Sequence, residues 1–304
     1  MLILTPTSWS DYELIDSGNG YRLERFGKYI LSRPDPQIIW KPRLSEKEWL
    51  KADATFKKTG ESGKWIIQNS LPEKWEVTYS LDKSNDTKLS FWVKLSPFKH
   101  TGIFPEQAPH WDWIAGILSL AAGKKQKLAT IDQQPNILNL FGYTGAASLA
   151  CAAAAARVTH VDASYPTIGW ARENQRLSGL ETMPIRWIED DVVKFVEREI
   201  RRGSKYDGII MDPPVFGHGP DGQVWKFNEN FPKLLASCRQ LLTDKPLFFI
   251  VNAYAISSSA IMLENVLKDY LSDLGGNIEV GELALQESNN GRLLSTGIFA
   301  RWSN

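Results

Sequence analysis

The chain has 304 residues, of which 43% are hydrophobic, so it can bury a substantial core and is not a disordered protein. Basic and acidic residues each number 35, which excludes the global positive field that dominates non-specific nucleic-acid binding. The two cysteines, Cys151 and Cys238, lie far apart, which gives neither a disulfide framework nor a metal-ligand spacing and fits a reducing cytoplasm.

The first hundred residues predict a small β-rich subdomain. Aromatic and β-branched residues are interrupted there by Gly, Pro, Asn and Asp, as is typical of short strands. The expected strands are 21–31, 65–69, 75–81 and 89–95. Six of the twelve tryptophans fall in this region: Trp9, Trp40, Trp49, Trp65, Trp75 and Trp92. Packing is the favoured interpretation of these rings, and a stacking platform for bases is the alternative.

From about residue 136, apolar runs of strand length alternate with helical stretches. This alternation predicts a parallel sheet covered by helices. The expected strands are 136–141, 158–162, 185–189, 206–211 and 247–252, and a closing hairpin is expected from 277–286 and 295–302. We expect no signal peptide and no membrane segment, because no apolar run approaches the roughly 20 residues of a membrane span.

Glycines follow the first strand of this alternating region. The segment 137–145 reads ILNLFGYTG, and the small-residue helix 146–156 comes next. Glycines at such a junction let a ligand approach the backbone beside a helix N-terminus. The spacing is not that of dinucleotide-binding folds, so a tight turn explains this segment equally well on its own.

An acid ends the next strand. Asp162 lies 20 positions beyond Gly142, and a carboxylate at this place can accept hydrogen bonds from both hydroxyls of a ribose. A cap for the helix 165–178 is the alternative. Together with the glycines, Asp162 predicts an adenosine-type ligand without specifying which one.

The fourth strand ends in Asp212, Pro213 and Pro214. Such a strand end faces the ligand crevice in open α/β sheets. Consecutive prolines fix φ, remove two N–H groups and leave their carbonyls as acceptors, and Phe216 can stack on a planar substrate. An ordinary turn is the weaker alternative, because this segment follows two other ligand-site signals, the glycines and Asp162.

Several stretches match one family in order over about residues 99–304. They are 100–107 (HTGIFPEQ), 138–145 (LNLFGYTG), 171–174 (AREN), 179–180 (GL), 191–193 (DVV), 206–207 (YD) and 212–216 (DPPVF). In these stretches the chain resembles class I S-adenosylmethionine-dependent methyltransferases of the bacterial large-subunit ribosomal RNA group, which includes C5-cytosine and N7-guanine enzymes. The resemblance implies a Rossmann-like α/β fold over 99–304, mostly parallel and ending in an antiparallel hairpin, after the β-rich subdomain of 1–98.

The resemblance also implies two sets of site residues. The cofactor set comprises Thr101, Gly102 and Phe104 bordering S-adenosylmethionine, Asn139, Gly142 and Gly145 around its methionine end, Asp162 on the ribose and Asp191 on the adenine. Tyr143 and Asp212 also belong to this set. The catalytic set, which faces the substrate, comprises Asp212, Pro213, Pro214 and Phe216. Asp190 is the alternative to its neighbour Asp191. Asn174 is given no role, and no metal is expected because the histidines lack a ligand spacing.

The chain departs from the pattern of the family's C5 enzymes. Methylation at pyrimidine C5 requires a cysteine thiolate to add to C6, because C5 has no lone pair. In those enzymes this cysteine follows the fifth strand, where residues 251–255 here read VNAYA. Cys151 and Cys238 are expected to be buried structural residues. A base nitrogen needs no covalent step, so guanine N7 and an exocyclic amine both stay open.

The expected function is therefore methyl transfer to a base nitrogen of RNA, in particular ribosomal RNA. The alternatives are a methyltransferase for a small molecule or a protein side chain, and a non-catalytic RNA-binding or assembly factor that retains the fold. The basic residues Arg198, Arg201, Arg202 and Lys205 suggest a phosphate site, but a solvated helix end before Gly203 is the favoured interpretation.

Overall fold

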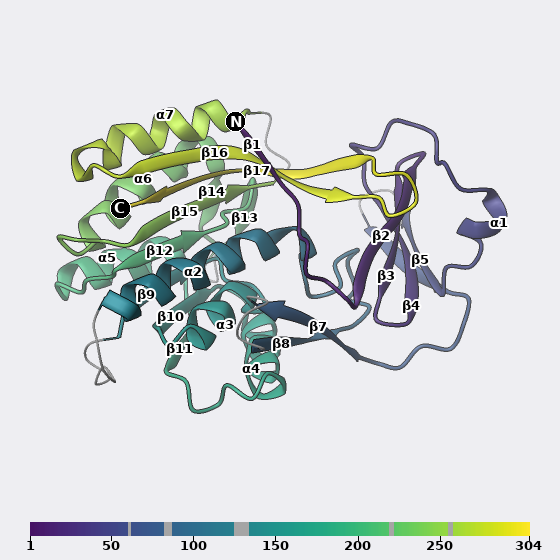
Figure 1. The fold of residues 1–304 in the computed structure, drawn as a ribbon, viewed down its shortest axis with the longest axis horizontal. Coiled ribbons are helices and arrows are strands. Elements are labelled where there is room, and N and C mark those ends of the chain that lie inside the picture. The colour runs from purple at the N-terminus through teal and green to yellow at the C-terminus, as the bar shows by residue number, and fades with distance from the viewer. Residues whose placement is uncertain (60–61, 82–86, 125–133, 219–221, 255–257) are drawn as a thin grey trace. The chain divides into compact units, whose positions relative to one another are not determined.

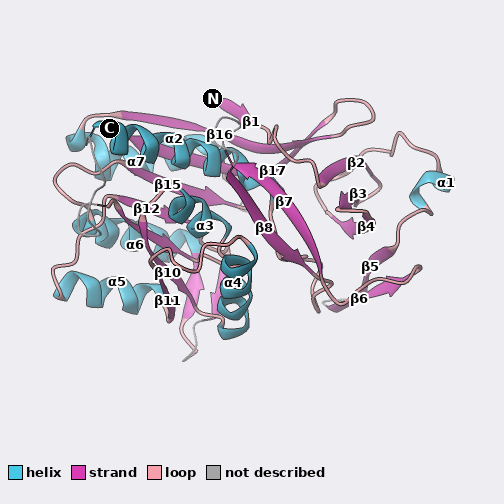
Figure 2. Cartoon of the chain, turned by 60° about the horizontal axis from the view of Figure 1, so that its bottom comes forward, coloured by secondary structure: helices cyan, strands magenta, loops and turns pink. Residues whose placement is uncertain are grey.

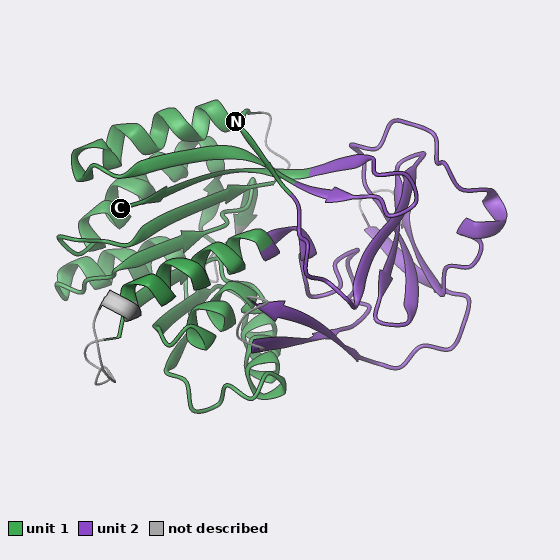
Figure 3. Cartoon of the chain, in the orientation of Figure 1, with its two compact units in different colours: residues 1–4, 109–283, 296–304 green, residues 5–108, 284–295 purple. Residues whose placement is uncertain are grey.

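The structure is a computed structural model that describes residues 1–59, 62–81, 87–124, 134–218, 222–254 and 258–304 (Figure 1). The chain forms two compact units (Figure 3). The larger unit comprises Met1–Leu4, Pro109–Leu283 and Thr296–Asn304, and the smaller unit comprises Thr5–Ala108 and Ala284–Ser295. Our sequence-based boundary after residue 98 treats each domain as one continuous segment, whereas each unit collects segments that are distant in the sequence.

An eight-stranded sheet forms the centre of the larger unit. Its strands are β1 (Leu2–Leu4), β9 (Asn136–Leu140), β10 (Arg157–Asp162), β11 (Ile185–Glu189), β12 (Gly208–Met211), β15 (Phe248–Ala253), β16 (Asn277–Gln286) and β17 (Leu293–Ser303). The strand order is β1-β16-β17-β15-β12-β9-β10-β11. The five strands from β15 to β11 are parallel, and β17 runs antiparallel to β15. The expected Rossmann-like fold is confirmed.

Helices cover both faces of this sheet (Figure 2). They are α2 (Ala108–Lys124), α3 (Ala146–Ala153), α4 (Tyr165–Leu177), α5 (Val192–Arg201), α6 (Phe227–Leu241) and α7 (Ala260–Leu271). One core joins alternate strand residues such as Leu138 and Ile209 to α5, α6 and α7, and a second joins Ile137 and Ile210 to α2 and α3. Burial on both faces explains why the central strands β9, β12 and β15 are mainly apolar. None of the described helices is long and apolar enough to cross a membrane.

The smaller unit contains a five-stranded sheet, a two-stranded sheet and a short helix. The strands are β2 (Tyr12–Gly18), β3 (Tyr21–Phe26), β4 (Tyr29–Pro34), β5 (Ala54–Thr59), β6 (Ser62–Ile67), β7 (Trp75–Leu81) and β8 (Thr87–Val93), and the helix is α1 (Glu46–Trp49). The expected strand 21–31 is wrong in one respect, because it divides into β3 and β4. Gly27, with φ +61°, makes the turn between them.

The tryptophans of the smaller unit are bonded within it. Indole N–H groups donate to protein acceptors from five of the six rings: Trp9, Trp40, Trp49, Trp65 and Trp75. Trp75 is buried and the other four rings are partly buried, and an indole N–H that is removed from water usually has such a partner. These bonds support the packing interpretation over a stacking platform for bases.

Candidate functional site

The carboxyl ends of β9 and β12 form the topological switch point of the large sheet. After β9 the chain continues to β10 on one side, and β12 pairs with β9 on the other. Ligands of open α/β sheets bind outside the carboxyl ends of the strands at such a point. The glycine turn follows β9, Asp162 ends β10 and Asp212 follows β12, so the topology gathers three predicted segments at one edge.

The turn after β9 has unusual backbone geometry. Phe141 has φ +57°, Tyr143 has φ +51° and Gly145, the N-cap of α3, has φ +88°. Positive φ is costly for the two aromatic residues, and such strain is concentrated at ligand sites. The turn is therefore held in its shape by its surroundings.

Gly142 is required by close packing against His160. A Cβ at Gly142 would lie 2.3 Å from Cε1 and 2.5 Å from Nδ1 of that ring. The His160 ring is fully buried, with Nδ1 3.0 Å from the Ser148 hydroxyl, and this hydroxyl accepts from Asn139 Nδ2 at 2.9 Å. Burial lowers the pKa of His160 to about 3, so a neutral imidazole lies behind the turn. Asn139 acts here as a support for the turn.

Asp162, the last residue of β10, forms a hydrogen bond with the glycine turn. Its Oδ2 accepts from the Tyr143 N–H at 2.9 Å, and its Oδ1 accepts from the Ser164 N–H at 2.9 Å. Burial raises the pKa of this carboxyl, while the two backbone bonds act in the opposite direction. Ser164, rather than Asp162, is the N-cap of α4. Each carboxylate oxygen retains capacity for another donor.

The acids after β11 both have partners in the protein. Asp191 is the N-cap of α5 and accepts from the Lys194 N–H at 2.9 Å. Asp190 forms an ion pair with Arg198, and its N–H donates to the Asp162 carbonyl at 3.1 Å. The backbone bond fixes this strand end beside β10.

The segment after β12 leads into a two-stranded hairpin of β13 (Phe216–His218) and β14 (Val224–Lys226). The Pro214 carbonyl accepts from Trp225 Nε1 at 2.6 Å, and the Trp225 ring lies 5.2 Å from the Phe141 ring. This carbonyl therefore has a bond inside the protein that our sequence-based expectation did not include. Phe216 is 55% exposed, so it is not a core residue.

Three predicted cofactor residues belong to the smaller unit. Thr101 is fully buried, and its hydroxyl has no hydrogen-bond partner among the described residues. Gly102 has φ +98°, and the Phe104 ring lies 5.4 Å from the ring of His100. Glu106 is also buried, with one carboxyl oxygen lacking a partner in the described chain, and burial raises its pKa. Buried polar atoms of this kind are rare in folded proteins.

Several residues that support the turn were not predicted from the sequence. Asn174 is fully buried and donates from Nδ2 to the Thr144 carbonyl at 3.0 Å. His160 and Trp225 were also given no role. One signal was present, because Asn139 and His160 are polar residues within apolar strands and lie opposite each other in the sheet register.

The cysteines are buried, as expected. Cys151 and Cys238 have no exposed surface, and burial raises the pKa of both thiols. A thiolate is the reactive form, so neither side chain is suited to nucleophilic attack. In the described part of the chain, no three His, Cys, Asp or Glu side chains gather in a metal-ligand arrangement.

Comparisons with known proteins agree with this geometry. The family model for S-adenosylmethionine-dependent methyltransferases matches residues 112–272. The crystal structure of the SAM-dependent methyltransferase from Agrobacterium tumefaciens is 41% identical, covers 100% of this chain and 93% of its own, and superposes with a TM-score of 0.90. The structure of SMU.776 complexed with SAH, 17% identical over 97% of this chain and 76% of its own with a TM-score of 0.71, shares the fold.

Curated relatives are less similar in sequence. Ribosomal RNA large subunit methyltransferase K from Neisseria meningitidis serogroup B is 27% identical over 69% of this chain and 51% of its own length. Ribosomal RNA large subunit methyltransferase I from Aeromonas salmonicida is 27% identical over 55% of this chain and 42% of its own. The chain thus spans about half the length of these relatives or less.

Proposed function

This chain belongs to the family of S-adenosylmethionine-dependent methyltransferases, and on that premise we propose that it methylates a base nitrogen of RNA, in particular ribosomal RNA. The observation that carries the proposal is the meeting of the glycine turn, Asp162 and the Asp212 segment at the switch point between β9 and β12. The names of the curated relatives support RNA as the substrate.

The residues at this edge fit the cofactor. Gly142 and Gly145 expose backbone at the N-terminus of α3, where a Cβ would meet neighbouring side chains. In our proposal Gly142, Tyr143 and Gly145 hold the methionine end, with Asn139 supporting them from behind. Asp162 holds the ribose, and Asp191 or its neighbour Asp190 faces the adenine. Thr101, Gly102 and Phe104 remain cofactor residues on the ground of the family resemblance alone.

S-adenosylmethionine supplies an electrophilic methyl group on a sulfonium, so the protein's task is to align the nucleophile and exclude water. We assign this task to Asp212 and the Pro213 carbonyl, which accept from the base edge, and to Phe216, which stacks on the ring. Pro214 positions the segment through Trp225.

A nitrogen acceptor is favoured over pyrimidine C5. The sequence has no cysteine in the segments directly after β12 and β15, and both cysteines of the chain are buried. An exocyclic amine would donate to Asp212, whereas guanine N7 needs no acceptor. We further propose that the β-rich unit binds RNA in its own right, and that the protein acts in the cytoplasm.

In the direct test, the purified protein is incubated with tritium-labelled cofactor and with the total RNA, protein or metabolite fraction of a strain that lacks the gene. The tritium transferred into each fraction is then measured. We expect the label in RNA. Label in protein or metabolites would identify the rival methyltransferases, and no label in any fraction would favour a non-catalytic factor.

A further inference from the structure

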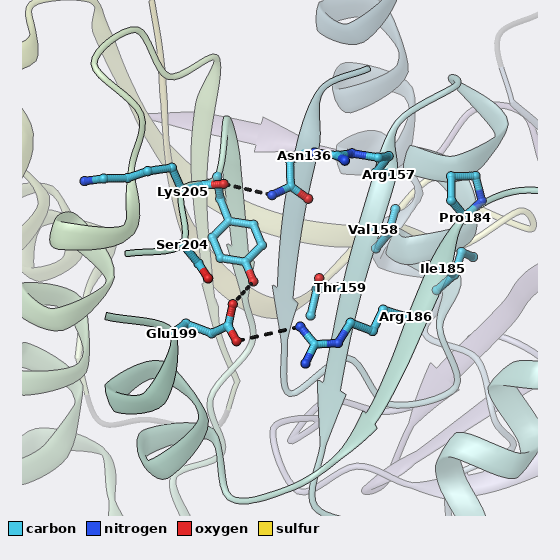
Figure 4. Close-up of a pocket in the computed structure, with 11 residues that line it drawn as sticks. Asn136, Arg157, Val158, Thr159, Pro184, Ile185, Arg186, Glu199, Ser204 and Lys205 are labelled. Carbon is cyan, nitrogen blue, oxygen red and sulfur yellow. Dashed lines mark hydrogen bonds and ion pairs between the residues drawn. The ribbon is translucent and has the colours of Figure 1, made fainter. Parts of the chain in front are cut away.

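The pocket of about 500 Å³ at the amino ends of β9, β10 and β11 contains cations that already have partners (Figure 4). Arg186 forms an ion pair with Glu199 at 3.7 Å, and Arg157 has partners in the protein as well. Lys205 donates to the Gln240 carbonyl at 2.8 Å. The cations of this pocket are therefore engaged within the larger unit, in contrast to three lysines of the smaller unit.

These three lysines lie on the ribbon that β5 and β6 form at the end of the five-stranded sheet (Figure 2). They are Lys57 and Lys58 of β5 and Lys64 of β6, and all three are exposed. Strand β4 pairs with β5 at Ala54 and Thr55, before the first of the lysines. The lysines therefore belong to the part of the β5–β6 ribbon that extends beyond the pairing with β4.

Lys57 and Lys64 lie directly opposite each other in the register of the ribbon. Directly opposite residues have Cβ atoms about 4.5–5.5 Å apart, and two like charges there destabilise the strand pair. Among the described residues, no acidic side chain pairs with Lys57, Lys58 or Lys64. The segment 57–64 reads KKTGESGK, with three lysines and one glutamate, in a chain without net charge. The ribbon thus carries a local excess of positive charge.

Another strand pair of the same sheet has opposite charges in register. Glu13 of β2 lies opposite Arg25 of β3, and the two side chains form an ion pair at 3.0 Å. Lysine on an edge strand commonly protects the edge against pairing with another chain, which accounts for Lys64 of β6. It does not account for Lys57, because β5 lies between β4 and β6. A local arrangement that lowers stability without a structural gain is expected at functional sites.

An exposed aromatic ring lies next to the ribbon. Trp65 of β6 donates from Nε1 to the carbonyls of Ser96 and Phe98, at 2.9 and 3.2 Å. These bonds fix the segment 96–98 beside the ribbon, and Phe98 is 71% exposed. Cations together with exposed aromatic rings suit an unpaired nucleic-acid strand, whose phosphates are anionic and whose bases present π-faces. An acidic protein surface would need only the cations.

We propose that the β5–β6 ribbon binds the phosphate backbone of the substrate RNA through Lys57 and Lys64. A phosphate between the two ammonium groups replaces their repulsion by two attractive contacts. Lys58 adds a further cation, and Phe98 stacks on an unpaired base. This inference rests on the proposed function and names the surface through which the β-rich unit contacts RNA. Phosphate contacts position RNA and carry no sequence information, so the choice of the methylated base belongs to the larger unit.

The test compares Lys57→Gln/Lys64→Gln with the control Lys47→Gln/Lys88→Gln, which removes two exposed lysines of the same unit, on α1 and β8. Binding of the full chain to ribosomal RNA from a strain that lacks the gene is measured over a salt series. Between about 50 and 200 mM salt, the wild-type affinity should fall about tenfold more than that of the ribbon variant, because two phosphate contacts are lost. The control should keep the wild-type salt dependence, and all three proteins should bind the cofactor equally. A control that loses as much as the ribbon variant would show a general charge effect and contradict the inference.

The charge-preserving variant Lys57→Arg/Lys64→Arg separates binding from a structural role. It should keep the wild-type salt dependence, because arginine also contacts phosphate. The melting temperature of the glutamine variant should equal or exceed that of the wild type, since a repulsive pair is removed. Wild-type salt dependence in the glutamine variant overturns the inference, and so does a reduced salt dependence in a folded arginine variant.

Labelling of RNA by the wild-type protein distinguishes failure of this inference from failure of the proposed function. If the wild type labels RNA, an unchanged salt dependence in the glutamine variant refutes the ribbon contact alone. A wild type that neither labels nor binds RNA refutes both. Vesicles of phosphatidylcholine with phosphatidylserine form a second arm. Vesicle binding that the glutamine variant loses, with RNA affinity unchanged, would assign the ribbon to an anionic membrane surface and contradict the RNA contact.

Discussion

Gly142 and His160 occupy adjoining space under the glycine turn, and this packing makes a residue-scale prediction. In Gly142→Ala the new methyl group overlaps the imidazole, so the turn must shift and cofactor affinity should fall about tenfold or more. The double variant Gly142→Ala/His160→Ala should recover part of that affinity, because the methyl group can enter the vacated space. Calorimetry with the cofactor measures both changes. No recovery in a folded double variant would show that the turn depends on His160 in another way.

The cysteines allow a second prediction at this scale. Both thiols are buried without a disulfide, so Cys151→Ala/Cys238→Ala should lower the free energy of unfolding by about 1–3 kcal/mol in total. Methyl transfer should be largely unchanged at a temperature where the protein is folded. A folded but inactive double variant would restore a covalent C5 mechanism.

At the scale of elements, the hairpin of β13 and β14 positions the Asp212 segment. Trp225→Phe removes the hydrogen bond to the Pro214 carbonyl while keeping an aromatic ring near Phe141. An ångström of misplacement can reduce a transfer rate by about a hundredfold. We therefore expect Trp225→Phe and Phe216→Ala to bind the cofactor within several-fold of wild type and to transfer methyl groups much more slowly. Normal single-turnover rates would remove the hairpin from the substrate side of the site.

The alternating elements of the larger unit could be predicted because the buried parallel strands are mainly apolar runs of strand length. Short elements were not predicted, because β1 and β13 have three residues each, too few to show a repeating pattern of apolar residues. The positions of Gly142, Asp162 and Asp212 follow from strand ends. Their supports do not, because Trp225 and Asn174 reach their partners across the fold.

At the scale of the whole molecule, buried histidines predict acid sensitivity. Burial lowers the pKa of His110 and of His160 to about 3 from an ordinary 6.5. At pH values between about 3 and 6.5 the unfolded chain therefore binds more protons than the folded protein. The free energy of unfolding thus decreases as the pH falls below about 6.5. Each histidine contributes up to about 1.4 kcal/mol per pH unit. Denaturant unfolding at about pH 7.5 and 5 should show a smaller loss for His160→Gln. An identical loss would contradict a neutral His160.

The central claim is that this molecule methylates RNA at the switch point of its sheet, and nucleoside mass spectrometry tests it most directly. Ribosomal RNA is digested from a strain that lacks the gene and from the same strain carrying the wild-type gene or Asp212→Ala. We expect one N-methylated nucleoside to disappear with the gene, to return with the wild type and to stay absent or greatly reduced with Asp212→Ala. An unchanged nucleoside profile on deletion of the gene would contradict the account.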